Sequence, residues 1–410
     1  MRCLKYLFFT LTFLLLQACN SAKAPIKLPS EQIATVEGQA IIKDGAQLLA
    51  RKMAIRDAIR QASLQNNSQI NSRTLVNRNS VMLDSFTLRT TALINNTKVI
   101  DEWIEEGIYH VRAMVRLSAG TMCTPQYRKR IAATAFPLVQ VSHSSMNESP
   151  DLMRGIPREI SNMLTQSGDY LGRDITHRTL YTELSRAPEI TGTHPYDVSN
   201  DINLAKRNRV QFVLSGVIRD LETSPSHYNR GSGFFSWLKS FTRYFHSTRS
   251  ITIDVYVHDG YSGALLFQHR YKDQASGDTS IPADVMVGSI PFKDTDTGNK
   301  ITKIINQSAL DIHESLNCYP FNTRIIKIKE NKVFIDAGAQ ERLNEGDQLV
   351  VYSSLGPINR PGGGQEVLGL HKRPTSVLTI TEITPLFAIG ELEVPPHMLG
   401  IRAGDWVKSW

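Results

Sequence analysis

The histidines and cysteines are the side chains of this sequence best suited to metal binding or nucleophilic catalysis. The chain of 410 residues has 11 histidines and 4 cysteines. It contains no HExxH motif, no His/Cys pair at metal-ligand spacing and no GxSxG nucleophile motif. Metal hydrolases and serine hydrolases are therefore disfavoured. We predict a protein that is not an enzyme and that uses no cofactor and no metal.

Two loops resemble ligand-binding motifs only in part. The stretch RPGGGQEVLGLHK, at residues 360–372, is rich in glycine but lacks the GK[ST] ending of a phosphate-binding loop, so we interpret it as a flexible β-loop. The stretch DTDTGN, at residues 294–299, resembles the opening of a calcium loop. Gly298 comes one place too early, and Ile305 stands where an EF-hand has its closing Glu, so we interpret it as a surface turn.

Residues 1–18 have the layout of an export signal. Arg2 and Lys5 precede an apolar run from Leu7 to Leu16, and small residues follow. The run is too short to span a bilayer comfortably as a permanent anchor. We therefore predict a signal peptide that directs the chain out of the cytoplasm.

Two cleavage sites compete at the end of this signal. Residues 22–24, Ala-Lys-Ala, fit ordinary signal peptidase, whereas residues 16–19, Leu-Gln-Ala-Cys, resemble the lipobox of bacterial lipoproteins. Pro25 would hinder cleavage at the first site, which favours lipidation of Cys19. Asn20 beside it resembles the signal for sorting to the outer membrane, and a multiply acylated Cys is a stable anchor.

Cys123 and Cys318 are the two cysteines left in the mature chain, since Cys3 lies in the signal and Cys19 at its border. An even pair in an oxidising compartment indicates a disulfide. A disulfide that closes so long a loop would stabilise the folded chain by at most about 5 kcal/mol. The alternative interpretation is two buried free thiols.

The charge balance argues against a nucleic-acid partner. The chain has 46 basic and 39 acidic residues, a formal net charge of +7, but no run of five or six Lys or Arg that would form a basic patch. A positive face would more naturally meet an acidic partner or an anionic surface. The length indicates two or three domains.

The first domain, residues 30–120, is predicted to be a compact α/β unit. Residues 33–42 are typical of a strand, and residues 44–65 of a helix with Asp44 near its N-cap. Small side chains in an i+4 row along this helix would allow close packing onto a sheet: Ala50, Ala54, Ala58 and Ala62. A later strand alternates apolar with polar residues, and its apolar positions are Tyr109, Val111, Ala113, Val115 and Leu117.

The second domain, residues 123–318, is predicted to be α/β as well. Its helix at 152–165 contains Pro157, which is tolerated only near the first turn. The remaining predicted elements are a buried strand at 133–141, a short helix at 201–209, a strand at 210–218, a hairpin at 251–271 and an amphipathic helix at 300–316. After Cys318 the pattern changes to short β-branched strands separated by turn residues, so residues 320–410 predict a small β-barrel, SH3-like in type.

One stretch of the second domain is unusually aromatic, GSGFFSWLKSFTRYFHSTRS at residues 231–250. Its spacing predicts an amphipathic helix inserted between two neighbouring strands, and we expect it to be an interaction helix. It could pack on its own domain, on a neighbouring protein or on a membrane surface. The residues of its apolar face are Phe234, Trp237, Leu238, Phe241, Tyr244 and Phe245.

Four stretches, in this order, resemble the flagellar assembly protein T family: ARKMAIRDAIRQASLQ at 50–65, CTPQYRKRIAATAFPL at 123–138, DVYVHDGYSGALLFQHRY at 254–271 and the terminal AGDWVKSW. The resemblance extends from about residue 30 to the end. It implies a multidomain α+β protein of the periplasm whose middle domain is like the amino-terminal domain of the translocation protein TolB.

The resemblance also implies a function. Members of that family form the H ring around the outer-membrane end of the flagellar basal body and support assembly of the T ring and stability of the motor. The implied partners are further copies of the chain, the outer-membrane ring and T-ring proteins, with attachment to the outer membrane if Cys19 is lipidated. The alternative is a cell-envelope adaptor or lipoprotein of TolB-like type that is unrelated to flagella.

Overall fold

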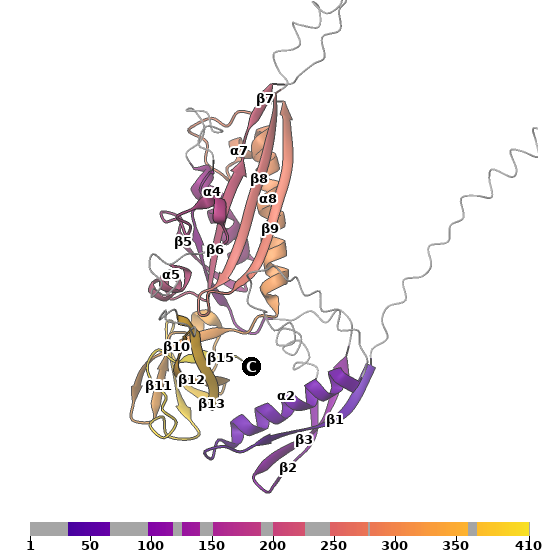
Figure 1. Cartoon of the computed structure of the whole chain (residues 1–410), viewed down its shortest axis with the longest axis vertical. Helices are drawn as coiled ribbons and strands as arrows, with labels where there is room; N and C mark the ends of the chain where they lie inside the picture. The colour runs from indigo at the N-terminus through magenta and orange to yellow at the C-terminus, as the bar shows by residue number, and fades with distance from the viewer. Residues whose placement is uncertain are drawn as a thin grey trace, which may run out of the picture.

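The fold consists of three units that Figure 1 shows joined around the C-terminal barrel, with the middle domain above it and the N-terminal domain below and beside it. The computed structural model describes residues 32–65, 97–117, 125–139, 151–189, 200–225, 247–277, 279–359 and 367–409. Predictions that concern other residues therefore lie outside the described part of the chain.

The N-terminal domain is a helix on an antiparallel three-stranded sheet of order β1-β3-β2. The predicted alanine row is confirmed, because all four alanines of the helix are buried against the sheet. Gly38 on the sheet allows this approach, since a Cβ there would lie 2.1 Å from the carbonyl oxygen of Ala54. The elements are β1 (Gln32–Ile41), α2 (Gln47–Gln65), β2 (Thr97–Glu105) and β3 (Ile108–Leu117).

The start of α2 differs from the prediction. Asp44 is not at its N-cap, because Asp44 and Gly45 both have positive φ, 51° and 77°, and form the turn that precedes the helix. The helix begins at Gln47. Its first free N–H groups are instead capped by Glu393, a residue of the barrel. A local pattern cannot reveal a cap that comes from another domain.

The middle domain is a mixed sheet of order β5-β4-β6-β8-β7, with β9 beside β8. Strands β4, β5 and β6 pair in parallel, whereas β6, β8 and β9 pair antiparallel, which confirms the predicted hairpin. Helices α4 and α8 pack on one face, and α5 lies on the other. The elements are β4 (Lys129–Thr134), α4 (Leu152–Gln166), β5 (Tyr170–Ile175), η2 (Leu184–Arg186), α5 (Asn200–Asn208), β6 (Phe212–Asp220), β7 (Thr223–Pro225), β8 (Ser247–Asp259), β9 (Leu265–Gly277), α7 (Ile290–Asp294) and α8 (Asp296–Asn317).

Two local predictions in this domain are wrong. The strand expected at 133–141 instead runs from Lys129 to Thr134. The chain then leaves the sheet, and the N–H of Phe136 donates to the carbonyl of Met153 in α4. That carbonyl is free because Pro157, four residues later in α4, has no N–H. The DTDTGN stretch is not a surface turn but the start of α8, where the Thr295 hydroxyl caps the N–H of Gly298.

The C-terminal domain is a closed barrel of order β10-β11-β14-β13-β12-β15, which confirms the predicted small β-barrel. The short strand β15 closes it by pairing with both β10 and β12. Apolar side chains from all six strands fill the interior. The elements are β10 (Asn322–Lys329), β11 (Lys332–Ile335), η4 (Ala339–Glu341), β12 (Gln348–Asn359), β13 (Val367–Ile383), β14 (Ala388–Leu392) and β15 (Trp406–Lys408).

Candidate interaction site at the junction of the middle domain and the barrel

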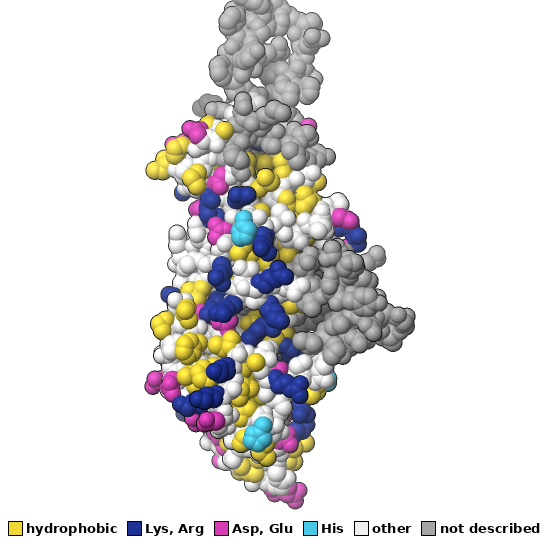
Figure 2. Space-filling model, turned by 90° about the vertical axis from the view of Figure 1, so that its left-hand side faces the viewer, with side chains coloured by type: hydrophobic (Ala, Val, Ile, Leu, Met, Phe, Trp, Pro, Cys, Tyr) yellow, Lys and Arg dark blue, Asp and Glu magenta, His cyan; other side chains and the backbone are white. Residues whose placement is uncertain are grey.

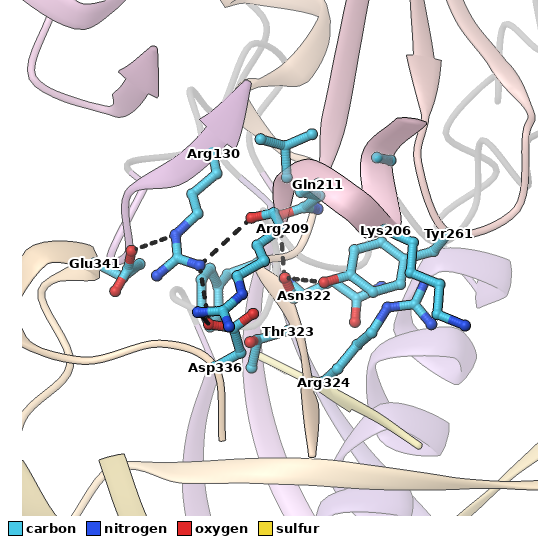
Figure 3. Close-up of a pocket in the computed structure, with 13 residues that line it drawn as sticks. Arg130, Lys206, Arg209, Gln211, Tyr261, Asn322, Thr323, Arg324, Asp336 and Glu341 are labelled. Atoms are coloured by element: carbon cyan, nitrogen blue, oxygen red, sulfur yellow. Dashed lines mark hydrogen bonds and ion pairs between the residues drawn. The ribbon is translucent and has the colours of Figure 1, made fainter. Parts of the chain in front are cut away.

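The middle domain and the barrel meet directly after α8, because residues 318–321 alone separate that helix from β10. We call their shared surface the junction. Its centre is the ion pair between Arg130 of β4 and Glu341 of η4, with 2.7 Å between Nε and Oε1. Arg130 also lies 3.3 Å from a carboxylate oxygen of Asp336. Figure 3 shows these side chains pointing toward one another across the junction.

The charges of this centre are balanced within the fold. Burial opposes the charge of Arg130, but the carboxylates of Glu341 and Asp336 outweigh it and raise the pKa of the guanidinium. Glu341 is fully buried, and its second oxygen accepts the N–H of Gly338 at 2.7 Å. Removing one partner of a buried ion pair strongly destabilises a fold, because the remaining charge is then buried without compensation.

Polar side chains complete the junction beside this ion pair. The amide of Gln211 donates to the carbonyl of Pro320 at 2.7 Å and accepts the N–H of Asn322 at 3.1 Å, so it ties the linker to the middle domain. The Tyr261 hydroxyl donates to the carbonyl of Asn322, and the guanidinium of Arg324 lies 4.7 Å from the Tyr261 ring centre. The remaining cavity of about 30 Å³ is the size of a single water molecule. The junction is therefore a packed interface between domains and no ligand pocket.

An open cleft lies next to the junction, between the edge strand β5 and the barrel. It encloses about 510 Å³, and we call it the basic cleft. Four arginines and a single carboxylate line it: Arg130, Arg173, Arg207, Arg209 and Asp336. Figure 2 shows Lys and Arg side chains gathered along the middle of the face that carries β5 and α5. Guanidinium groups in this number suit carboxylates or phosphates.

The barrel also contacts the N-terminal domain. Both oxygens of Glu393 accept the N–H of Leu48 in the first turn of α2, and one also accepts that of Gln47. Arg56 of α2 also interacts with Tyr352 of the barrel. Burial raises the pKa of the Tyr352 hydroxyl, and the charge of Arg56 lowers it. The barrel thus lies between the other two domains and holds both by polar contacts.

Of the candidate disulfide, lipidation and interaction-helix residues that the sequence singled out, only Cys318 lies in the described part of the chain. It is the C-cap of α8. Cys19, Cys123 and the whole apolar face of the aromatic stretch lie outside the described residues. The sequence did not reveal the arginines of the basic cleft, although the stretch KRNR at 206–209, which ends α5, was a partial signal.

Metal clusters and membrane-spanning helices are two further features relevant to function, considered within the described residues. No group of three or more His, Cys, Asp or Glu there could hold a metal ion. Among the same residues, no helix is both long and apolar enough to cross a membrane.

Comparison with known proteins identifies the family. The model of the flagellar assembly protein T N-terminal domain matches residues 32–119, and the model of the middle domain of the same protein matches residues 121–287. The chain belongs to the flagellar assembly protein T family. For this family member, α8 and the barrel lie beyond the matched residues and are known from the structure alone.

Comparison with solved structures finds matches of low identity that cover about half of this chain. The hypothetical protein CT253 from Chlamydia trachomatis is 16% identical, with 47% of this chain and 98% of that chain covered and a TM-score of 0.30. The PelC dodecamer from Paraburkholderia phytofirmans is 11% identical, with 49% and 94% covered and a TM-score of 0.23. Lipoprotein GNA1162 from Neisseria meningitidis is 15% identical, with 44% and 99% covered and a TM-score of 0.23. A comparison with curated proteins finds no match.

Proposed function

We propose that this chain is a non-enzymatic structural subunit of the H ring, acting in the periplasm around the outer-membrane ring of the flagellar basal body. The observation that carries the proposal is membership of the flagellar assembly protein T family across both the N-terminal and the middle domain. Its partners are further copies of itself, proteins of the outer-membrane ring and proteins of the T ring. The subunit supports assembly of the T ring and thereby stabilises the motor.

The physical requirement of such a ring is a repeated heterologous contact. One face of each subunit must complement a different face of the next, and the rotation between them must close the ring. The faces must also keep a fixed relation within each subunit. Polar contacts of the barrel with α2 and with β4 support this requirement, because they link all three domains.

Electron cryo-tomography of flagellated cells tests the proposal. We expect deletion of the gene to remove density around the outer-membrane ring and to reduce motility, and the full-length gene to restore both. An unchanged basal body in the deletion strain, together with an envelope defect, would instead support a cell-envelope adaptor.

We also propose that lipidation of Cys19 tethers the subunit to the outer membrane. A Cys19→Ser variant removes the acceptor thiol, and mass spectrometry of the mature protein from cells measures the acyl chains directly. A wild-type mass that corresponds to cleavage after residue 24 without lipid would contradict this tether and leave the ring proposal unaffected.

A further inference from the structure

The basic cleft carries positive charge that the fold does not neutralise. Arg130 is matched by Glu341 and Asp336. Arg209 reaches Asp336 only at 3.8 Å, and its side chain is 64% exposed. Arg173 donates to the backbone carbonyl of Asn208. Among the described residues, no carboxylate lies within ion-pair distance of Arg173 or Arg207. The cleft therefore suits an acidic segment from outside the chain's own fold.

A complementary acidic tip is present in the N-terminal domain. The β2–β3 hairpin turns through Glu106 and Gly107, whose φ angles of 49° and 77° are those of a tight two-residue turn. This turn presents the carboxylates of Glu105 and Glu106, both exposed, and neither has an ion-pair partner within the described residues. We call this turn the acidic tip.

Apolar contacts would accompany the charges. Ile104 of β2 is 48% exposed and Ile41, next to the hairpin turn, is 64% exposed. On the other side, Leu386 at the rim of the basic cleft is 58% exposed. The acidic tip thus has exposed isoleucines beside its two carboxylates, and the basic cleft has an exposed leucine beside its arginines. The two surfaces are complementary in both apolar and charged groups. An interface needs this combination of an apolar centre and a charged rim.

The acidic tip and the basic cleft lie far apart in one chain. The hairpin is at the lower end of the molecule in Figure 1, on the other side of the barrel from β5. Two complementary surfaces at different places on one subunit are what a heterologous contact requires, and such contacts close into rings when the rotation permits. Resting on the ring function proposed above, we propose that the basic cleft of one subunit binds the acidic tip of a second copy.

Charge reversal tests this contact. A cleft variant, Arg207→Glu with Arg209→Glu, has an acidic tip and an acidic cleft. A tip variant, Glu105→Lys with Glu106→Lys, has a basic tip and a basic cleft. We expect each variant alone to self-associate about tenfold more weakly than wild type in sedimentation experiments, because like charges then face each other. An equimolar mixture should associate as wild type does, since the surfaces of the two variants complement each other in both directions.

Matched controls separate the contact from net charge and from turn strain. Lys327→Glu with Lys329→Glu makes the same change of charge at exposed positions of β10. Glu330→Lys places lysine at a turn position with φ of 56°, close to that of Glu106. Both controls should self-associate as wild type does, and thermal unfolding should show that all variants are folded.

Tomography of cells that express these variants distinguishes the two proposals. Each reversed variant alone should lack ring density, and co-expression of the two should restore it. Ring density that persists in both single variants would overturn the contact and leave the H-ring proposal standing. Loss in both variants without restoration on co-expression would show that the surfaces bind other partners and would also overturn the contact. No ring density attributable to the wild-type chain would overturn the H-ring function itself.

Discussion

Glu393 caps the helix of another domain, because both oxygens of its carboxylate accept the backbone N–H of Leu48, at 3.1 and 2.9 Å. These two residues are 345 positions apart. A carboxylate at a helix N-terminus satisfies free N–H groups and also interacts favourably with the helix dipole. The contact therefore stabilises α2 and the docking of its domain on the barrel at once.

Replacing Glu393 with Ala should loosen this docking. We expect a loss of about 1 kcal/mol, as for other helix caps, and faster hydrogen exchange at the N–H groups of Gln47 and Leu48. Glu391→Ala, an exposed neighbour on β14, is the control. Unchanged exchange in the first turn of α2 would show that the contact is not maintained in solution.

Gly38 should not tolerate even the smallest side chain. A Cβ at this position would lie 2.1 Å from the carbonyl oxygen of Ala54 and 2.3 Å from the nitrogen of Ala58, so α2 would have to move away from β1. We expect Gly38→Ala to destabilise the N-terminal domain by about 1 to 3 kcal/mol. Thermal unfolding measures this loss, and Gln39→Ala on the same strand should cost much less.

The junction should depend on Glu341 more than on Asp336. Glu341→Ala leaves the guanidinium of Arg130, 19% exposed, without its closest partner and also frees the N–H of Gly338. We expect a cost of about 3 to 5 kcal/mol, as for other broken buried pairs.

Asp336→Ala is the matched comparison, because Asp336 lies farther from Arg130, at 3.3 Å. Denaturant titrations of both variants measure the free energy of unfolding, and the loss for Asp336→Ala should be smaller than that for Glu341→Ala. Equal costs for the two variants would contradict the central role of the Arg130–Glu341 pair.

Acid should destabilise the middle domain through His258. Burial lowers the pKa of this residue to about 4, against the attraction of Asp201, which favours the protonated ring. In the unfolded chain the pKa is about 6.5, so between pH 6.5 and 4 the unfolded state binds a proton that the folded state does not. Stability should therefore fall on acidification through this window, by on the order of 3 kcal/mol.

Urea titrations at several pH values measure this effect. His258→Gln should flatten the dependence between pH 4 and 6.5, and His177→Gln, at an exposed position, should leave it unchanged. A slope in the His258→Gln variant equal to that of wild type would assign the acid sensitivity to other groups.

The predicted disulfide can be tested by its effect on mass and stability. The amino group of Lys129, six residues after Cys123, donates to the carbonyls of Leu316 and Asn317, which directly precede Cys318. The start of β4 therefore lies beside the end of α8. We expect non-reducing mass analysis to find a peptide that joins Cys123 and Cys318, and reduction to cost on the order of 2 to 5 kcal/mol. Two free thiols in the mature protein would contradict the bond.

The sequence predicted elements best where the pattern is local. The alanine row of α2 and the alternation in β3 arise from packing on a single neighbour, so periodicity alone was sufficient. The boundary of β4 was missed, because it depends on a carbonyl of α4 that Pro157 leaves free for Phe136. Likewise the cap of α2 comes from the barrel.

The candidate site was harder to predict than the fold. Arg207 and Arg209 stand in a visible basic stretch, but Arg130 and Arg173 come from separate strands of the sheet. Only the parallel pairing of β4 with β5, and the docking of the barrel beside them, brings these arginines together. A search for runs of like charge along the sequence cannot find a cluster that the tertiary structure assembles.

The short strand β15 determines when the barrel can close during synthesis of the chain. Because it pairs with both β10 and β12, the barrel has two open edges until Trp406–Lys408 has emerged. Open strand edges are templates for pairing with other chains. A chain that emerges from its N-terminus would therefore expose both edges from the moment that β10 and β12 have emerged until β15 follows, and it would pair most readily with other chains in that interval.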